Sequence, residues 1–166
     1  IAVTSCTAGL YVSLSALGFS KDDEAIAPAF TWISSANVVE HLGGKVVFCD
    51  IDILTYHMSL DSMKRMYSDK VKAIIYPHLF GNMSDTNKIK EFCQEKNIYF
   101  IEDACQSLGS SYNNVKAGTI GDISTLSFNA NKVVSGIAGG GAIITDGDTE
   151  IFKKLRKHGN HEILGY

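Results

Sequence analysis

The sequence predicts an α/β fold of three layers, in which helices flank a mostly parallel sheet. Two observations predict this class. Apolar runs of strand length alternate with segments of helical periodicity along the chain, which is the pattern of βαβ units. In addition, residues 98–101 are apolar without a break, as in strands that are buried on both faces of a parallel sheet.

The expected elements follow one another in order. Helical spacing of Leu10, Leu14 and Leu17 predicts a first helix, which Ser5 or Thr7 caps and which ends near residue 18. The later expected elements are a strand over 25–27, a helix over 30–42, a strand over 46–49, a short helix over 60–66, a strand over 71–76, a helix over 85–96, a strand over 98–101, a strand over 123–128 and a helix close to the end of the chain.

Composition is that of an ordinary globular domain with enough residues to bury a core. The 166 residues are 45% hydrophobic and 20% charged. The net charge of −3 is spread without a basic block, so nucleic acid is not an expected partner. No apolar run approaches the roughly 20 residues of a membrane span, and the first residues lack the basic start of a signal peptide. We therefore expect a cytoplasmic protein with no membrane partner.

Four cysteines, Cys6, Cys49, Cys93 and Cys105, lie far apart along the sequence. They show no Cys-x-x-Cys spacing of the kind found in many zinc and redox sites. We expect them to be reduced core residues of a cytosolic protein, and we expect no metal site.

Candidate functional residues follow the predicted strands. In open α/β sheets the ligand lies beyond the carboxyl ends of the strands, so the residues directly after each apolar run are the candidates. They are residues 28–32, Asp50, His78, Glu102, Asp103 and the loop around Lys132. Asp103 follows the strand that should be most deeply buried, where a carboxylate needs a cationic or donor partner. The alternative is that Asp103 caps a helix beginning at Ala104.

Three further features carry chemistry, each with a plainer alternative. Lys132 lies between a predicted strand and the glycines at 139–141; an amine held partly out of water can attack a carbonyl, whereas most lysines are solvated surface charges. The helix start at 5–8 can bind an anion or can be an ordinary capped terminus. Trp32 can fill the core or offer a flat face on which a ring stacks.

Together these features match the requirements of pyridoxal phosphate. This cofactor needs a lysine for a Schiff base, an acid beside the pyridine nitrogen, an aromatic face and phosphate donors. Lys132, Asp103, Trp32 and the helix start at 5–8 together with Ser127 supply one candidate for each requirement. The sequence therefore predicts a pyridoxal phosphate site.

Eight motifs in a fixed order make the prediction more specific. They are Thr-Ser-Cys-Thr-Ala-Gly-Leu (4–10), Pro-Ala-Phe-Thr-Trp (28–32), Phe-Cys-Asp-Ile-Asp (48–52), Pro-His-Leu-Phe-Gly (77–81), Ile-Glu-Asp-Ala-Cys-Gln-Ser-Leu-Gly (101–109), Gly-Asp-Ile-Ser-Thr-Leu-Ser-Phe (121–128), Lys132 and Arg-Lys-His-Gly (156–159). This series closely resembles the DegT/DnrJ/StrS family of fold-type I aminotransferases, which act mostly on nucleotide-linked keto sugars. The resemblance implies that residues 1–166 are part of the large, cofactor-binding domain, without an opening segment and without the C-terminal small domain.

The resemblance also implies a role for each matching residue. Lys132 would bind the cofactor covalently, and Asp103 would pair with the pyridine nitrogen. The other implied contacts are Gln106 near the ring hydroxyl, Trp32 stacked on the ring, and backbone at Thr7 and Ala8 with the Ser127 hydroxyl around the phosphate.

The implied reaction moves an amino group from glutamate to a nucleotide-linked keto sugar, for amino-sugar and cell-surface polysaccharide synthesis. The implied assembly of the full-length protein is a homodimer. Three alternatives remain open. A sugar dehydratase of the same family carries histidine at the position of Lys132, and a regulator binds the cofactor without turnover. A Rossmann-type nucleotide binder needs Gly-x-Gly-x-x-Gly after the first strand, where this chain has only the isolated Gly9.

Overall fold

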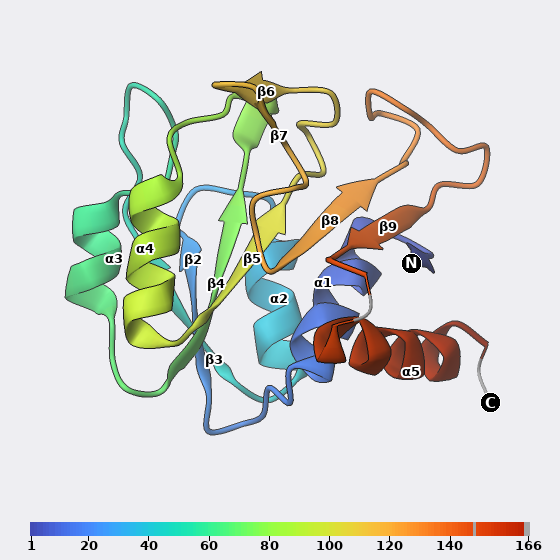
Figure 1. Cartoon of the computed structure of the whole chain (residues 1–166), viewed down its shortest axis with the longest axis horizontal. Helices are drawn as coiled ribbons and strands as arrows, with labels where there is room; N and C mark the ends of the chain where they lie inside the picture. Colours follow the sequence, from blue (N-terminus) through green and yellow to red (C-terminus); the bar gives the residue numbers. More distant parts are fainter. Residues whose placement is uncertain (148, 165–166) are drawn as a thin grey trace.

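A computed structural model describes residues 1–147 and 149–164, with the side chains of residues 159–164 left out. The predicted three-layer α/β architecture is confirmed (Figure 1). The strands of the main sheet are β1 (Ala2–Val3), β2 (Glu24–Pro28), β3 (Lys45–Cys49), β4 (Val71–Pro77), β5 (Tyr99–Asp103), β8 (Ile123–Ser127) and β9 (Gly141–Ile144). The helices are α1 (Cys6–Ala16), α2 (Ser34–His41), α3 (Leu60–Met66), the 3-10 turn η1 (Leu79–Gly81), α4 (Asn87–Lys96) and α5 (Glu150–Leu164).

The seven strands lie in the order β1-β9-β8-β5-β4-β2-β3. Strands β3, β2, β4, β5 and β8 are parallel to their neighbours, as the βαβ pattern predicts. Strand β9 runs antiparallel to both β8 and β1. The sequence did not predict β9; it arises because the loop at 128–140 turns the chain back along β8. The carboxyl ends of β5 and β8 and the glycine-rich loop consequently meet at one edge of the sheet.

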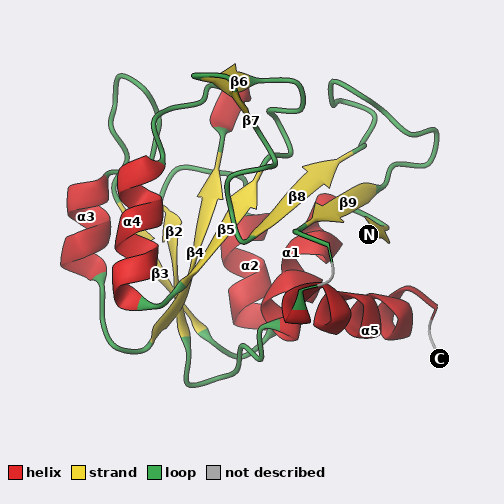
Figure 2. Cartoon of the chain, viewed as in Figure 1, coloured by secondary structure: helices red, strands yellow, loops and turns green. Residues whose placement is uncertain are grey.

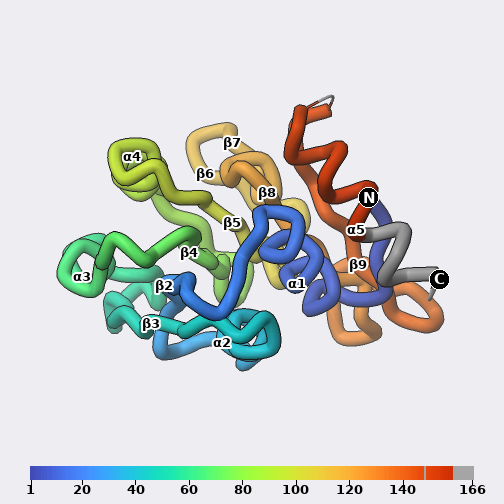
Figure 3. Tube along the Cα trace, turned by 90° about the horizontal axis from the view of Figure 1, so that it is seen from below, coloured from blue at the N-terminus to red at the C-terminus, as the bar shows by residue number. Residues whose placement is uncertain are grey.

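Helices cover the sheet on both faces (Figures 2 and 3). On one face α3 and α4 pack through Met63, Ile89 and Phe92 onto the strands. On the other face α1, α2 and α5 form a second core with Leu10 and Leu155. Among the described residues, no helix has both the length and the apolar character to cross a membrane.

Helix α1 begins where the sequence predicts. Ser5 is its N-cap, and the Ser5 hydroxyl accepts a hydrogen bond from the backbone N–H of Ala8 at 3.1 Å. Leu10 and Leu14 are fully buried, so the predicted helical stripe faces the sheet. The N-terminus of α1 therefore lies fixed against the ends of β8 and β9.

The second helix begins later than the sequence predicts over 30–42. Helix α2 begins at Ser34, and residues 29–33 form an irregular segment that prolongs the path of β2. The N–H of Ala29 still bonds to the carbonyl of Cys49, as in the sheet, and the ring of Phe30 contacts that of Tyr56 at 5.7 Å between centroids. Sheet pairing and this ring contact thus delay the helix by one turn.

Smaller differences concern ends and loops. Helix α4 starts two residues later than expected, because the Asp85 carboxylate accepts a hydrogen bond from the N–H of Asn87 and forms a turn there. A two-stranded hairpin, β6 (Ser111–Tyr112) and β7 (Val115–Lys116), was not predicted. Its turn is made by Asn113 and Asn114, both with positive φ, a conformation that asparagine tolerates well.

One glycine holds the sheet edge against α1. A Cβ atom on Gly141 would lie 2.6 Å from the backbone carbon of Ser5 and 2.7 Å from the nitrogen of Cys6. We expect Gly141→Ala to lower the free energy of unfolding by about 2 kcal/mol, because backbone atoms cannot move aside cheaply. Urea titration measures the loss. Gly147→Ala is the matched control, since no atom of the described part of the chain lies within 4 Å of its added Cβ. Equal stability of the two variants would contradict this packing.

Candidate active site

A cavity of about 450 Å³ opens at the sheet edge where β5 and β8 end. Its walls come from the start of α1, the turn after β5, the loop at 128–140 and the segment before α2. The cavity brings together six of the seven residues that the sequence singled out, namely Thr7, Trp32, Asp103, Gln106, Ser127 and Lys132. Ligand pockets of several hundred Å³ with a few convergent polar groups are typical binding sites.

Asp103 is the last residue of β5 and is only 4% exposed. Its Oδ1 atom accepts hydrogen bonds from the N–H of Cys105 at 3.1 Å and from Sγ of Cys6 at 3.5 Å. Among the described residues, none donates a hydrogen bond to Oδ2. The alternative of a helix cap is wrong, because Ala104 begins a turn. Asp103 thus presents a buried carboxylate with one oxygen open to a donor in the cavity.

Lys132 is half-buried and lines the same cavity from the loop that follows β8. A tight turn fixes its backbone. The N–H of Lys132 donates to the carbonyl of Asn129 at 2.9 Å, and the side-chain oxygen of Asn129 accepts a hydrogen bond from the N–H of Ala130 at 2.7 Å. The loop closes where the N–H of Gly136 donates to the carbonyl of Phe128 at 2.7 Å. These bonds fix the backbone of the loop from which Lys132 lines the cavity.

Two other predicted residues form the rim. Trp32 is 69% exposed and lines the cavity, so the interpretation of a core tryptophan is wrong. Gln106 lies in the turn after β5, where its Oε1 accepts a hydrogen bond from the N–H of Phe80 at 2.8 Å. That bond uses the amide oxygen and leaves the amide nitrogen to donate. Both residues are placed to contact a planar ligand.

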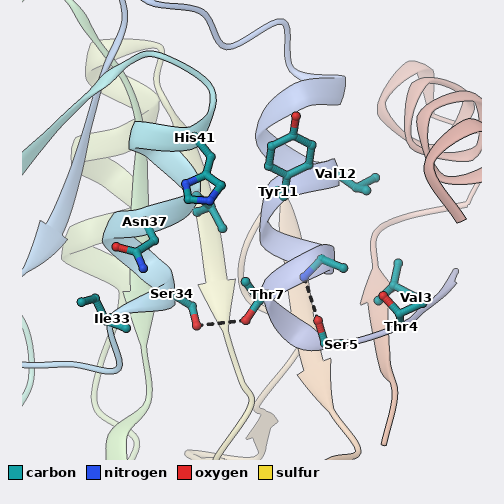
Figure 4. A pocket seen from close by; sticks show the side chains of 12 residues that line it. Val3, Thr4, Ser5, Thr7, Tyr11, Val12, Ile33, Ser34, Asn37 and His41 are labelled. Carbon is teal, nitrogen blue, oxygen red and sulfur yellow. Dashed lines mark hydrogen bonds between the residues drawn. The ribbon is translucent and has the colours of Figure 1, made fainter.

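The predicted phosphate donors are Thr7 and Ala8 at the start of α1 and Ser127 at the end of β8. Thr7 and Ser127 line the cavity, whereas Ala8 lines only a neighbouring pocket between α1 and α2, to which Thr7 also contributes (Figure 4). The N–H of Ala8 is already bonded to the Ser5 hydroxyl. In Figure 4 the Thr7 hydroxyl meets that of Ser34, 2.9 Å away. A contact of Ala8 with phosphate stays a prediction that would require the cap bond to be shared.

Sequence reasoning noted Glu102 but missed its partners. Glu102 precedes Asp103 in β5, so it points to the other face of the sheet, and it is fully buried. Its carboxylate lies 2.9 Å from Nε2 of His78 and accepts hydrogen bonds from the N–H groups of Gly118 and Ile120. The Ser124 hydroxyl donates as well, at 2.8 Å.

Burial by itself raises the pKa of Glu102. The hydrogen bonds from His78, Gly118 and Ile120 outweigh this effect and lower the pKa to about 2. The carboxylate is therefore ionised, and it anchors the loop at 118–121. The available signal was that His78 and Glu102 each follow an apolar run in the sequence, and these runs form the neighbouring strands β4 and β5.

One of the other predicted candidates lies outside the cavity, and several residues that were not predicted lie in it. Asp50 pairs with Arg65 at 3.4 Å on an exposed surface, away from the cavity. Cys105 is only partly buried and lines the cavity, so the expectation of four core cysteines is wrong for this residue. Ser34, Asn129 and Asn131 also line it; sequence reasoning missed them because only folding brings these ordinary polar residues together.

The donor set fits pyridoxal phosphate. A phosphorylated pyridine aldehyde requires an amine, an acid for the ring nitrogen, a flat apolar face and hydroxyl donors. The cavity holds Lys132, the buried carboxylate of Asp103 with its open Oδ2, the indole of Trp32 and the Ser127 hydroxyl. A cationic ring nitrogen would supply the partner that Asp103 lacks among the described residues.

Comparison with known proteins identifies the family. The sequence matches the DegT/DnrJ/EryC1/StrS aminotransferase family over residues 1–164, and the chain belongs to that family. It is 34% identical over 163 residues to the GDP-perosamine synthase of Vibrio cholerae, covering 98% of this chain and 44% of the relative.

Two solved structures share the fold. The aminotransferase of Psychrobacter cryohalolentis superposes with a TM-score of 0.93 at 32% identity, covering 97% of this chain and 40% of that one. NtdA of Bacillus subtilis, solved with bound cofactor PMP, gives a TM-score of 0.86 at 34% identity, covering 93% of this chain and 34% of that one. This chain thus spans less than half the length of the proteins that it matches.

Proposed function

We propose that this chain forms the cofactor-binding domain of a pyridoxal phosphate-dependent aminotransferase acting on a nucleotide-linked keto sugar. The observation that carries the proposal is the meeting of Lys132 and the buried Asp103 on one cavity. Family membership and the cofactor bound to the similar B. subtilis protein support it.

Pyridoxal phosphate, when bound, supplies an aldehyde that condenses with amines and a ring that takes up the electrons of a neighbouring C–H bond. In the proposed site the amine of Lys132 would hold the cofactor and would serve as the general base that moves a proton. Asp103 keeps a proton on the ring nitrogen, because its carboxylate is buried and has a free oxygen. Trp32 covers one ring face and excludes water, while Ser127 and Thr7 hold the phosphate end.

The substrates follow from the relatives. The similar protein of Vibrio cholerae makes a GDP-linked sugar, which supports a nucleotide-linked keto sugar as acceptor. Glutamate as donor, and amino-sugar synthesis for a cell-surface polysaccharide as the purpose, complete the proposal. A cytoplasmic homodimer is part of it as well; the four free thiols suit a reducing compartment.

Absorption spectroscopy tests the transamination half-reaction. We expect the purified protein to bind pyridoxal phosphate with a visible band of the bound cofactor. On addition of glutamate this band should disappear while pyridoxamine phosphate forms, because the proposed role of Lys132 is to move the proton. Chromatography of the released cofactor measures the conversion.

The outcomes separate the candidate functions. Conversion with glutamate, followed by recovery of the band with a nucleotide-linked keto sugar, supports the proposed function. A protein that binds the cofactor but never converts it would instead be a regulator of the same fold. A protein that binds no cofactor would refute the assignment of the cavity. Glutamine should be assayed in parallel to establish the donor.

A further inference from the structure

The cavity walls contain two thiols to which the proposed transamination assigns no role. Cys6 is the first residue of α1, and Cys105 lies in the turn after β5. They are far apart in sequence, yet their Sγ atoms and a carboxylate oxygen of Asp103 all lie within 4.8 Å of one another. Both cysteines are free. The fold has therefore produced a close pair of thiols inside a solvent-connected cavity.

The two thiols differ in access. Cys105 is partly exposed and lines the cavity, whereas Cys6 is 8% exposed, with its Sγ bonded to Asp103 at 3.5 Å and to Thr125 at 3.3 Å. The hydrogen bond with Cys105, burial and the charge of Asp103 raise the pKa of the Cys6 thiol. A reagent entering from solvent thus meets Cys105 first, with Cys6 directly behind it.

We propose that Cys6 and Cys105 form a peroxide-sensitive thiol pair, in which Cys105 is oxidised first and Cys6 then closes a disulfide. Sulfur of Cys105 attacks hydrogen peroxide: an S–O bond forms, the O–O bond breaks, and the leaving hydroxide takes the thiol proton as water. Sulfur of Cys6 then attacks sulfur of Cys105, so that an S–S bond forms, the S–O bond breaks and a second water leaves. Two thiols lose two electrons, and one peroxide is reduced to two waters.

The geometry allows this closure. A disulfide needs its sulfurs at about 2 Å, so the pair must approach from its present separation. Cys105 lies in a turn rather than in a helix or strand, and its side chain has the cavity on one side, which leaves it room to rotate toward Cys6. The crosslink would tie the start of α1 to the end of β5, directly beside Asp103.

The crosslink has a consequence for the cavity. Sγ of Cys6 now donates a hydrogen bond to Oδ1 of Asp103, and a disulfide sulfur has no hydrogen to donate. If Asp103 holds the ring nitrogen, which rests on the proposed function, the oxidised protein binds pyridoxal phosphate more weakly than the reduced one. Reductant restores binding.

Thiol counting and peptide mapping test the pair. The purified protein, with a chelator present, is treated with hydrogen peroxide, denatured and titrated for thiols, then digested without reductant. Four cysteines are free before treatment, so joining one pair leaves two. We expect one crosslinked peptide containing Cys6 and Cys105, which dithiothreitol separates.

Variants establish the order of the steps. Cys6→Ser should stop at a sulfenic acid on Cys105 that dimedone labels, and Cys105→Ser should give neither label nor crosslink. The control is Cys93→Ser, which removes a buried thiol that does not line the cavity and should leave the crosslink intact. Circular dichroism verifies that each variant folds. If a variant does not fold, the crosslink in the unaltered protein still tests the proposal.

Retention of all four thiols, or crosslinks that involve Cys49 or Cys93, would overturn the proposal. These readouts do not involve the cofactor, so they test the thiol pair independently of the transaminase assignment. Equal affinity of the oxidised and reduced protein for pyridoxal phosphate, with the crosslink present, would overturn only the inferred effect on Asp103.

Discussion

Replacing Lys132 with alanine is expected to abolish conversion of bound pyridoxal phosphate to pyridoxamine phosphate by glutamate. Lys132 supplies the amine that the cavity offers to the cofactor, and general acid–base catalysis of this kind typically contributes about 10²–10⁴-fold. Loss of the covalent anchor adds to that effect. Single-turnover kinetics with glutamate, followed by absorbance, measure the rate.

Lys116→Ala is the matched control for this substitution. Lys116 is exposed in β7 and does not line the cavity, so its loss removes a positive charge without altering the site. We expect the control to retain the rate of the unaltered protein. Unchanged turnover in Lys132→Ala would contradict the role given to this lysine, and an equal loss in both variants would indicate an effect of charge alone.

Replacing Glu102 with glutamine is expected to cause the largest loss of stability. The fully buried carboxylate accepts hydrogen bonds from Gly118, Ile120 and Ser124. In the glutamine variant an NH2 group replaces one carboxylate oxygen and faces hydrogen-bond donors, so those donors lose their acceptor. The pKa of Glu102 is lowered from 4.5 to about 2, which corresponds to about 3 kcal/mol of stability. Urea unfolding at neutral pH measures this loss.

The pH dependence gives the same experiment a second readout. Because the pKa of Glu102 is lower in the folded protein, its contribution is complete above pH 4.5 and is lost as the pH falls toward about 2. The stability gap between the unaltered protein and Glu102→Gln should therefore narrow over this range. Glu91→Gln, at an exposed position of α4, is the control. A gap that does not change with pH would contradict the proposed network.

The sequence predicted the part of the fold that depends on periodicity. Unbroken apolar runs such as residues 98–101 can be buried on both faces only in a covered parallel sheet, so the layers followed from the pattern. The start of α2 could not be predicted, because sheet pairing of Ala29 and the ring contact of Phe30 with Tyr56 come from distant residues. Strand β9 was missed for a similar reason, since its glycine-rich beginning carries no strand signal.

The candidate site was also predicted only in part. Asp103 could be chosen because it comes just after an apolar run, and Lys132 because it lies in the loop between a predicted strand and a glycine run; the fold brings such positions to one edge. The bond between Ser5 and Ala8, the pair formed by Cys6 and Cys105, and the partners of Glu102 depend on side-chain directions. Those directions are fixed by packing between elements that are far apart in sequence, which a single sequence does not reveal.

Mapping the covalent attachment of the cofactor tests the central claim most directly. The protein is loaded with pyridoxal phosphate, reduced with borohydride, digested and analysed by mass spectrometry. We predict a phosphopyridoxyl group on Lys132 in the unaltered protein, and a loss of cofactor affinity without a change of labelled residue in Asp103→Asn. A label on a different lysine, or no label at all, would contradict the account of this cavity.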